Sequence, residues 1–303
     1  MAAESSPRVY VIIPNYNTAD LLCGCLASLQ AQQDAPPMQL FVVDNASTDD
    51  SVARVRSAFP DVCVLSSDHN GGFAYAVNLG LRAAMAGGSW RPNDYVLLLN
   101  SDTELPPDAV RRMVAFMEAH PQAGAAGPKL ILPDGRPDRA ARRSFPTPEV
   151  AFYRLFGLSA LFPRSRRFGR YNLTYLDPDT TTEVDSVCGA FMLVRARVVE
   201  EIGLLDEAFF MYGEDLDWAY RIKERGWKIY YYPEVVVRHW KRASSRKVPQ
   251  AALRAFYEAM RIFHRKHYAA RYPWVVNFLI ELGISLRYGL ARLFRLLGWR
   301  GGW

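Results

Sequence analysis

The first 120 residues alternate between short apolar runs and amphipathic segments. Continuous apolar runs predict strands at 9–13, 40–43, 62–65 and 95–99. The segments between and after them have the spacing of helices, at 21–30, 51–59, 73–85 and 107–120. Because the strand runs do not alternate with polar residues, we expect strands that are covered on both faces. The pattern predicts an α/β fold in which a mostly parallel sheet carries helices on both faces.

The pattern is less regular beyond residue 130. Residues 133–179 are rich in proline and arginine and predict a long loop. The remaining predicted elements are a strand over 184–194 interrupted at Gly189, a segment over 209–225 that becomes helical near Asp215, a strand over 228–237 and a helix over 251–267. We expect one domain over 1–247, made of halves 1–130 and 131–247, and a helical extension over 248–303.

The C-terminal segment, 274–303, combines apolar residues with arginine. Glu281 and Arg287 interrupt it, so no uncharged run reaches the roughly 20 residues that cross a membrane. Basic and apolar residues alternate at helical spacing, which predicts an amphipathic helix in peripheral contact with a membrane surface. The alternative is an ordinary helix packed on the domain.

Composition and charge narrow the class of protein. Half of the 303 residues are hydrophobic and 22% are charged, which argues against disorder. The four cysteines form no C-x-x-C pair, and residues 1–8 lack the apolar stretch of a signal peptide. We therefore expect a cytoplasmic domain, at the inner face of the plasma membrane if the C-terminal helix contacts lipid. The net charge is +6, and the arginines that cluster over 136–170 suit phosphate, anionic lipid, nucleic acid or simply a solvated face.

Polar side chains follow each of the four predicted strands of the first half. They are Asn15 and Asn17 after the first strand, Asp44 after the second, 68–70 after the third and Asp102 after the fourth. In a parallel sheet the carboxyl ends of the strands share one edge, and ligands bind beyond that edge. The sequence therefore predicts a polar ligand site there.

Seven short blocks occur along the chain in order. They are Ile13-Pro-Asn-Tyr-Asn17, Val42-Val-Asp-Asn-Ala-Ser-Thr-Asp49, Asn70-Gly-Gly-Phe-Ala74 with Asn78, Leu98-Leu-Asn-Ser-Asp102, Gly189-Ala-Phe-Met-Leu-Val-Arg195, Phe209-Phe-Met-Tyr-Gly-Glu-Asp-Leu-Asp-Trp218 and Arg238-His239. Together they resemble glycosyltransferase family 2, with similarity to its bacterial rhamnosyltransferase-like members, over roughly residues 8–245. The resemblance implies a GT-A fold and transfer of a sugar from a nucleotide diphosphate donor to an acceptor hydroxyl.

The donor side of such a site must stabilise a departing diphosphate. Mg²⁺ or Mn²⁺ often supplies the countercharge, and both prefer oxygen ligands. The family's D-x-D motif corresponds to 100–102, where Asn100 replaces the first carboxylate and only Asp102 brings a charge. The resemblance assigns Asp102 and His239 to the metal, with phosphate contact as the alternative role of His239.

The nucleoside is expected beside the first two strands. The Asp44 carboxylate can accept a hydrogen bond from N3–H of uracil or thymine, and Pro14 and Tyr16 can flank the base. The turn at Asn70 and Gly71 opens a helix and is expected to leave backbone N–H groups free for a polar ligand. The full donor set is Pro14, Tyr16, Asn17, Asp44, Asn70, Gly71, Asn78, Asn100, Ser101 and Asp102.

Three neighbouring acids compete for the role of catalytic base. Position within the family motif favours Asp215, while Glu214 and Asp217 are expected to orient the acceptor or the loop. Crowding of like charges is expected to raise their carboxylate pKa values. The acceptor side is completed by Gly189 and Ala190, by Trp218 as a stacking platform or a core residue, and by Arg142 and Arg143 as ligands of an acceptor diphosphate.

A single base suits an inverting reaction, because the acceptor attacks opposite the leaving group. The resemblance suggests L-rhamnose from dTDP-rhamnose and an acceptor on a cell-surface glycan or a lipid-linked precursor. A UDP-sugar donor is the main alternative. A nucleotidyltransferase is disfavoured, because 14–17 after the first strand lacks the expected glycine-rich basic loop. A basic nucleic-acid-binding protein is also disfavoured, because the chain shows no recognition motif and strand-end carboxylates repel phosphate without a metal.

Overall fold

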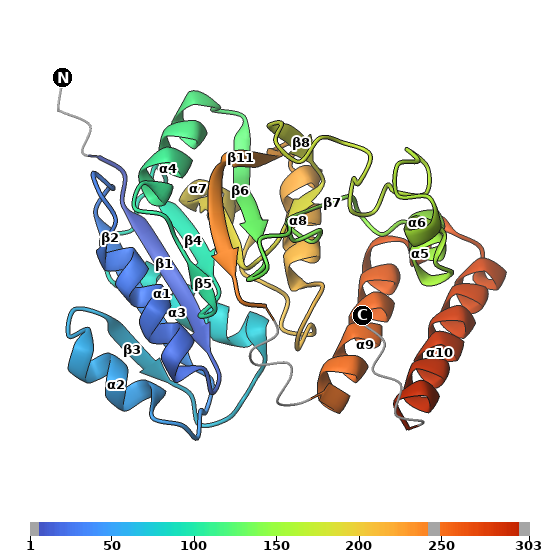
Figure 1. The fold of residues 1–303 in the computed structure, drawn as a ribbon, viewed down its shortest axis with the longest axis horizontal. Helices are drawn as coiled ribbons and strands as arrows, with labels where there is room; N and C mark the ends of the chain where they lie inside the picture. The colour runs from blue at the N-terminus through green and yellow to red at the C-terminus, as the bar shows by residue number, and fades with distance from the viewer. Residues whose placement is uncertain (1–5, 242–248, 297–303) are drawn as a thin grey trace.

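The computed structural model describes residues 6–241 and 249–296 (Figure 1). Its first half contains β1 (Val9–Asn15), α1 (Ala19–Gln30), β2 (Met38–Asp44), α2 (Ser51–Ala58), β3 (Cys63–Ser66), α3 (Phe73–Ala86), β4 (Tyr95–Leu99), β5 (Thr103–Glu104) and α4 (Ala109–Ala119). Every strand and helix predicted for this half is confirmed, with ends that shift by two residues or fewer. The short strand β5 was not predicted.

The second half departs further from the prediction. It contains β6 (Ala123–Ile131), β7 (Arg142–Arg143), α5 (Pro148–Leu155), α6 (Leu158–Leu161), β8 (Thr182–Val184), β9 (Ser186–Val187), β10 (Phe191–Arg195), α7 (Ala196–Ile202), α8 (Glu214–Glu224), β11 (Lys228–His239), α9 (Pro249–His267), a 3-10 turn (Ala269–Arg271) and α10 (Trp274–Leu296). The loop predicted over 133–179 is wrong in part, because it holds α5, α6 and β7. The single strand predicted over 184–194 is three short strands.

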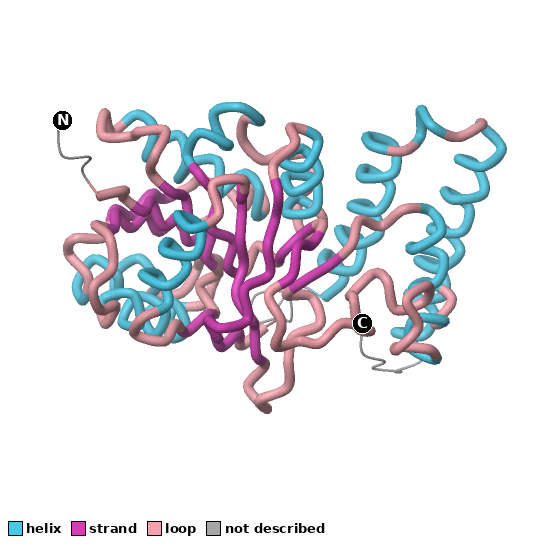
Figure 2. The backbone as a smooth tube through the Cα atoms, turned by 90° about the horizontal axis from the view of Figure 1, so that it is seen from above, coloured by secondary structure: helices cyan, strands magenta, loops and turns pink. Residues whose placement is uncertain are grey.

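Among the described residues, nine strands form one sheet. The path runs β3-β2-β1-β4-β10-β6-β11-β5, and β8 pairs with β11 outside it. The pairs β3-β2, β2-β1, β1-β4 and β6-β11 are parallel, whereas β10 is antiparallel to both of its neighbours. Figure 2 shows the strands between helices on either side. The mostly parallel sheet expected from the sequence is therefore confirmed.

The antiparallel strand β10 determines what meets at the carboxyl edge of the sheet. Its register sets Phe191 opposite Leu99, so the residues just before β10 lie beside the residues just after β4. The backbone N–H of Asn100 donates to the carbonyl of Ala190 at 3.0 Å. The 189–190 segment is thereby fixed against the predicted donor motif.

Helices α9 and α10 form an antiparallel pair at the end of the molecule opposite α2 (Figure 1). Helix α9 packs on α8 through an apolar cluster made of Phe209, Leu216, Tyr220, Ala259, Phe263 and Tyr268. Helix α10 packs on α9 through Leu253, Tyr257, Ile284 and Ala291. The expected helical extension is present over the described residues, and 297–303 lie outside them.

Candidate active site

Hydrogen bonds join the carboxyl ends of three predicted strands. Asn15 at the end of β1 donates from Nδ2 to Asp44 Oδ1 at the end of β2, at 2.9 Å. Thr18 donates to Asn15 Oδ1 at 2.7 Å, and its hydroxyl lies 2.8 Å from that of Ser101 after β4. Because Asn15, Asp44 and Ser101 are all buried, this network fixes the edge where the sequence predicted a ligand site.

The loop after β1 has the backbone of a turn. Asn17 has a φ of 55°, in the left-handed region that asparagine tolerates. Its side-chain oxygen accepts from the backbone N–H of Thr48 at 2.7 Å and of Asp49 at 3.2 Å. The two loops that flank Asp44 are thus tied together, and Pro14 and Tyr16 are half-buried at the same strand end.

Asn45, which is not among the predicted donor residues, holds the glycine turn before α3. Asn45 accepts from the N–H of Gly71 and donates to the carbonyl of Gly72, each at 3.0 Å. Asn70 Oδ1 accepts from the N–H of Gly72 at 3.1 Å. The two glycine N–H groups are therefore engaged within the protein, which corrects the expectation that they are free for a ligand.

Asn78 was predicted on the donor side but serves another part of the fold. It is buried in α3, where Nδ2 donates to the carbonyl of Leu205 at 2.9 Å and to Glu207 at 2.8 Å. Its oxygen accepts from the N–H of Leu205 at 3.0 Å. These contacts bind α3 to the loop before α8 and use all the polar atoms of the side chain.

The last strand brings His239 to the donor motif. Strand β11 pairs with β5 so that His239 lies opposite Thr103, and the N–H of Trp240 donates to the carbonyl of Asp102 at 2.9 Å. Nε2 of His239 lies 3.3 Å from Asp102 Oδ1. The two residues expected to share a metal are thus neighbours and both are buried.

A second carboxylate, missed in the sequence, faces the other side of the imidazole. Asp138 Oδ2 lies 3.4 Å from His239 Nδ1, and Asp138 Oδ1 lies 2.6 Å from Lys241 Nζ. Burial lowers the pKa of His239, but Asp102 and Asp138 on either side raise it, to about 9. Asp138 belongs to the segment predicted as loop, and nothing in its local pattern separates it from a turn residue.

The side chains beside His239 suit a divalent cation. Asn100 Oδ1 is buried and has no hydrogen-bond partner among the described residues, and Asn100 Nδ2 lies 3.5 Å from His239 Nε2. Asp102 and His239 thus face each other, and the Asn100 side chain lies beside them with its amide nitrogen toward the imidazole. No cluster of three or more His, Cys, Asp or Glu side chains suitable for a metal occurs within 6–241 or 249–296. This set fits Mg²⁺ or Mn²⁺ held jointly with donor phosphates.

The three acids at the start of α8 lie in three different environments. Burial and the nearby Asp215 raise the pKa of Glu214 to about 8, and Glu214 Oε2 has no partner among the described residues. Asp215 forms a buried ion pair with Arg143 at 2.6 Å. Burial raises the pKa of Asp217, but His267, Lys266 and Arg221 hold it below its usual range. The expected rise of the pKa is found for Glu214, whereas the pKa of Asp217 is lowered.

Two residues, Gly189 and Ala190, connect Asp215 to the donor motif. Its Oδ2 accepts from Arg143 at 2.6 Å and from the N–H of Gly189 at 2.9 Å, and its Oδ1 accepts from the N–H of Leu216 at 2.8 Å. Gly189 precedes Ala190, whose carbonyl is bonded to Asn100. A Cβ on Gly189 would lie 3.3 Å from Asp215 Cβ, so the glycine permits this close approach.

Three residues predicted on the acceptor side have structural contacts instead. The Asp217 side chain is fully buried and bonded to His267 at 2.8 Å. Trp218 is also fully buried, and its Nε1 donates to the carbonyl of Gly203 at 2.9 Å. Arg142 donates to the carbonyls of Leu176 and Asp177 at 2.6 and 2.7 Å. These groups are occupied by the protein, and Arg143 contacts Asp215 rather than presenting itself as a free phosphate ligand.

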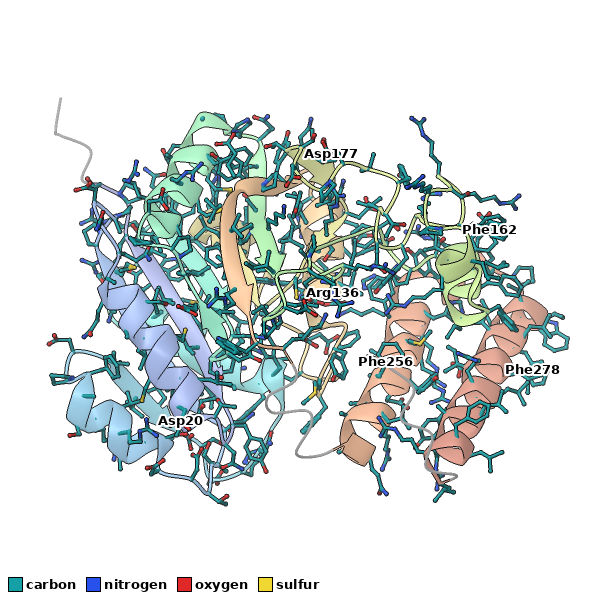
Figure 3. The ribbon with its side chains drawn as sticks, in the orientation of Figure 1. Asp20, Arg136, Phe162, Asp177, Phe256 and Phe278 are labelled. Carbon is teal, nitrogen blue, oxygen red and sulfur yellow. The ribbon has the colours of Figure 1, made fainter. Side chains whose placement is uncertain are left out.

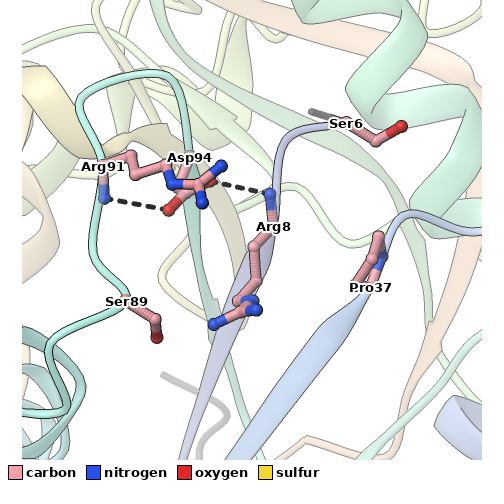
Figure 4. A pocket seen from close by; sticks show the side chains of 6 residues that line it. All are labelled: Ser6, Arg8, Pro37, Ser89, Arg91 and Asp94. Atoms are coloured by element: carbon pink, nitrogen blue, oxygen red, sulfur yellow. Dashed lines mark hydrogen bonds between the residues drawn. The ribbon is translucent and has the colours of Figure 1, made fainter. Parts of the chain in front are cut away.

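A surface pocket lies at the opposite edge of the sheet. Its lining consists of Ser6, Arg8, Pro37, Ser89, Arg91 and Asp94, which precede or flank the starts of β1, β2 and β4 (Figure 4). Asp94 accepts there from the N–H groups of Arg8 and Arg91 at 2.8 and 2.9 Å. Since ligands of such sheets bind at the carboxyl edge, this pocket does not belong to the site.

Most of the chain matches a known protein family. The model of the glycosyltransferase-like family 2 matches residues 7–257. The chain belongs to this family. N-acetylglucosaminyl-diphospho-decaprenol L-rhamnosyltransferase of Mycobacterium tuberculosis is 28% identical over 282 residues, which are 91% of this chain and 90% of the relative. Hexosyltransferase Agl10 of low-salt glycan biosynthesis in Haloferax volcanii is 26% identical over 213 residues, 70% of this chain and 61% of the relative.

Solved structures agree on the fold. TarS residues 1–349 of S. aureus superpose with a TM-score of 0.53 at 18% identity, over 93% of this chain and 71% of that one. GalNAc-T7 with UDP, GalNAc and Mn²⁺ superposes with a TM-score of 0.56 at 14% identity, over 86% of this chain. This chain spans 48% of the GalNAc-T7 chain. The expected GT-A fold is confirmed.

Proposed function

We propose that this glycosyltransferase transfers L-rhamnose from dTDP-rhamnose, with inversion, to a hydroxyl of a lipid-linked or cell-surface glycan precursor at the cytoplasmic side of a membrane. The sugar and acceptor follow the name of the Mycobacterium tuberculosis relative, which matches nearly the full length of both chains. A UDP-sugar is the second candidate, because the superposed GalNAc-T7 structure contains UDP.

One observation supports the reaction most directly. The 189–190 segment connects Asp215 to Asn100 by two backbone hydrogen bonds, 2.9 Å at one end and 3.0 Å at the other. A carboxylate and the donor motif are therefore separated by a single peptide unit, although Asp102 and Asp215 are 113 positions apart in the sequence. A reacting sugar bound between them can meet both.

Asp215 is suited to accept the proton of the acceptor hydroxyl. An ionised carboxylate offers about four lone-pair positions, and Arg143, Gly189 and Leu216 use three of them. The remaining position can accept from a hydroxyl. Arg143 is a positioning residue here, because its ion pair holds the carboxylate in one orientation.

The donor side supplies the second half of the chemistry. Asp102 and His239, with the Asn100 oxygen, would hold a divalent cation, which would balance the charge of the departing diphosphate. Asp44, oriented by its hydrogen bond from Asn15, would hold the nucleobase, and Asn17 ties together the loops beside them. Attack from the face opposite the diphosphate inverts the anomeric centre and requires the one base described above.

A donor screen tests this proposal. Purified protein, Mg²⁺ or Mn²⁺ and a panel of dTDP- and UDP-sugars are expected to release nucleoside diphosphate most rapidly from dTDP-rhamnose when a lipid diphosphate-sugar acceptor is present. Preference for a UDP-sugar would replace the donor assignment and leave the reaction class intact. Tight, salt-sensitive nucleic-acid binding without any release would overturn the class for this chain.

Asp215→Asn tests the base. It is expected to lower the transfer rate by at least about 10²-fold while donor binding, followed by calorimetry, stays within a few-fold of the unsubstituted protein. Because this change leaves Arg143 buried without a counter-ion, the double variant Arg143→Gln/Asp215→Asn serves as the folding control. Near-normal transfer by either folded variant would contradict the assignment.

A further inference from the structure

The outer face of α10 is apolar and exposed. Its stripe consists of Val275, Leu279, Leu282, Leu286, Leu290 and Leu293, which are spaced by three or four residues and are all 42–59% exposed. Trp274 begins the helix and is 78% exposed. By length and composition α10 is the one helix of the described residues that could cross a membrane. A solvent-facing stripe of this length marks an interaction surface.

The inner face of α10 is already committed to α9. Glu281 pairs with Arg265 at 2.7 Å and with Arg261 at 3.3 Å, and Asn277 lies 2.9 Å from His264. Crossing a bilayer would either break these pairs or carry α9 and its charges into hydrocarbon, which is costly. The contacts therefore favour a helix that lies along a surface with its outer stripe buried.

A second apolar element lies at the same end of the molecule. Phe152 of α5 and Phe156 just after it are 50% and 58% exposed, and Leu161 and Phe162 further on are 70% and 53% exposed. The rings of Phe152 and Phe156 pack together, with centroids 4.5 Å apart. Figures 1 and 2 both place α5, α6 and α10 at the end far from α2, and Figure 3 shows Phe162 and Phe278 at that end.

The charge around these elements is mostly positive. Residues 148–171 and 274–296 contain eight arginines and two glutamates. Both glutamates pair with arginine, Glu149 with Arg167 and Glu281 with Arg265. Arg164, Arg166 and Arg170 are exposed. A second copy of the same face would meet this charge with like charge, whereas anionic lipid head groups complement it.

We propose that the α10 stripe and the 152–170 segment together form a lipid-facing surface that binds an anionic bilayer in the plane of its head groups. The stripe and the phenylalanines enter the interface, and the arginines contact lipid phosphates. This lipid-facing surface does not depend on which sugar the protein transfers. Its test uses no donor, so failure of this proposal is distinguishable from failure of the proposed function.

Vesicle sedimentation of the full chain tests the surface. Binding is expected to vesicles of phosphatidylcholine mixed with phosphatidylglycerol, to weaken as salt is raised and to be at least about tenfold weaker with phosphatidylcholine alone. Leu279→Ser/Leu286→Ser and Arg164→Glu/Arg166→Glu are each expected to reduce binding by about tenfold or more. Arg56→Glu, a single charge reversal at an exposed position on the distant α2, is the control for charge reversal elsewhere on the surface and is expected to bind normally.

Three outcomes would overturn the proposal. One is equal binding by the unsubstituted protein and both double variants, with native circular dichroism in all. Another is a dimer in solution that Leu279→Ser/Leu286→Ser converts to a monomer, without vesicle binding in either form, which would assign the stripe to a second copy. The third is resistance of the membrane-bound protein to alkaline extraction, which would indicate a spanning helix.

Discussion

Asp138 contacts His239 from the side of the imidazole that faces away from Asp102. It holds His239 Nδ1, which fixes the imidazole so that Nε2 faces Asp102. Removing such a carboxylate behind a metal-binding histidine costs about 10- to 100-fold in metal affinity. Asp138→Asn is therefore expected to weaken Mn²⁺ binding by that factor in calorimetry with nucleoside diphosphate present.

Asp134→Asn is the control for that experiment. Asp134 belongs to the same segment, but it is exposed and pairs only with the neighbouring Arg136. Its substitution is expected to leave Mn²⁺ affinity unchanged. Equal affinities for all three proteins would show that Asp138 does not position His239 for the metal.

Glu214 makes stability depend on pH. Burial and Asp215 raise its pKa from 4.5 to about 8, so the folded state binds more protons than the unfolded state between these values. The free energy of unfolding therefore falls as pH rises from about 4.5 to about 8. Glu214→Gln removes this loss and is expected to stabilise the protein at pH 8 by on the order of 3 kcal/mol, with little effect at pH 4.

Urea denaturation at the two pH values measures this difference. Glu224→Gln, exposed near the end of the same helix, is the matched control and is expected to change stability by less than about 0.5 kcal/mol at either pH. If the Glu214→Gln variant is no more stable than the unsubstituted protein at pH 8, ionisation of the Glu214 carboxyl does not lower the free energy of unfolding, and the prediction is wrong.

At this scale the sequence predicts which residues gather but not what each one does. The strand-end residues Asn15, Asp44 and Asp102 follow from the rule that parallel strands share an edge. The separate roles of Glu214, Asp215 and Asp217 do not, because their partners Arg143 and His267 are distant in sequence. A side chain's environment is a tertiary property, so neighbouring acids look alike in the sequence.

Between elements, Asp217 is the clamp that joins α8 to α9. Its Oδ1 lies 2.8 Å from both Lys266 and His267, and its Oδ2 lies 3.0 Å from Arg221. Breaking a buried ion pair by removing one partner costs about 3–5 kcal/mol, and the Asp217 side chain is fully buried. Asp217→Asn is expected to lower the free energy of unfolding by that amount in urea denaturation.

The same lysine provides the control. Lys266 also pairs with Asp206, whose side chain is 31% exposed and therefore better solvated. Asp206→Asn is expected to cost less than about 1 kcal/mol. Similar losses for the two variants would mean that the clamp is an ordinary surface pair.

Strand β6 shows why an element escapes prediction. Its sequence, AGAAGPKLI, has the small residues and proline that strands usually avoid. The structure requires them, because a Cβ at Gly124 would lie 2.7 Å from Trp227 Cβ and one at Gly127 would lie 2.7 Å from Val187 Cβ. Strands β1 and β4 contain no glycine, and their apolar runs identify them directly.

Across the whole molecule, the candidate active site and the α10 stripe lie on opposite sides of α9. The candidate site lies at the carboxyl edge of the sheet, whereas the α10 stripe lies beyond α9. Leu279→Ser/Leu286→Ser is therefore expected to retain normal transfer to a soluble acceptor analogue and to lose at least about tenfold in rate on an acceptor embedded in anionic vesicles. Parallel assays with the two acceptors measure this. An equal loss of rate with both acceptors would mean that the substitutions disturb the folded structure and not the contact with lipid.

The turn at Gly72 has a consequence for how the enzyme can be altered. Gly72 has a φ of +91°, and its missing side chain leaves the space that the Phe210 carbonyl occupies. That carbonyl accepts from the N–H of Phe73 at 2.8 Å, so the start of α3 is fastened to the segment that leads into α8. A residue with a side chain at 72 would clash with this carbonyl and displace the segment that leads into α8. Under the proposed function, such a substitution is expected to alter the choice of acceptor more than the binding of the donor.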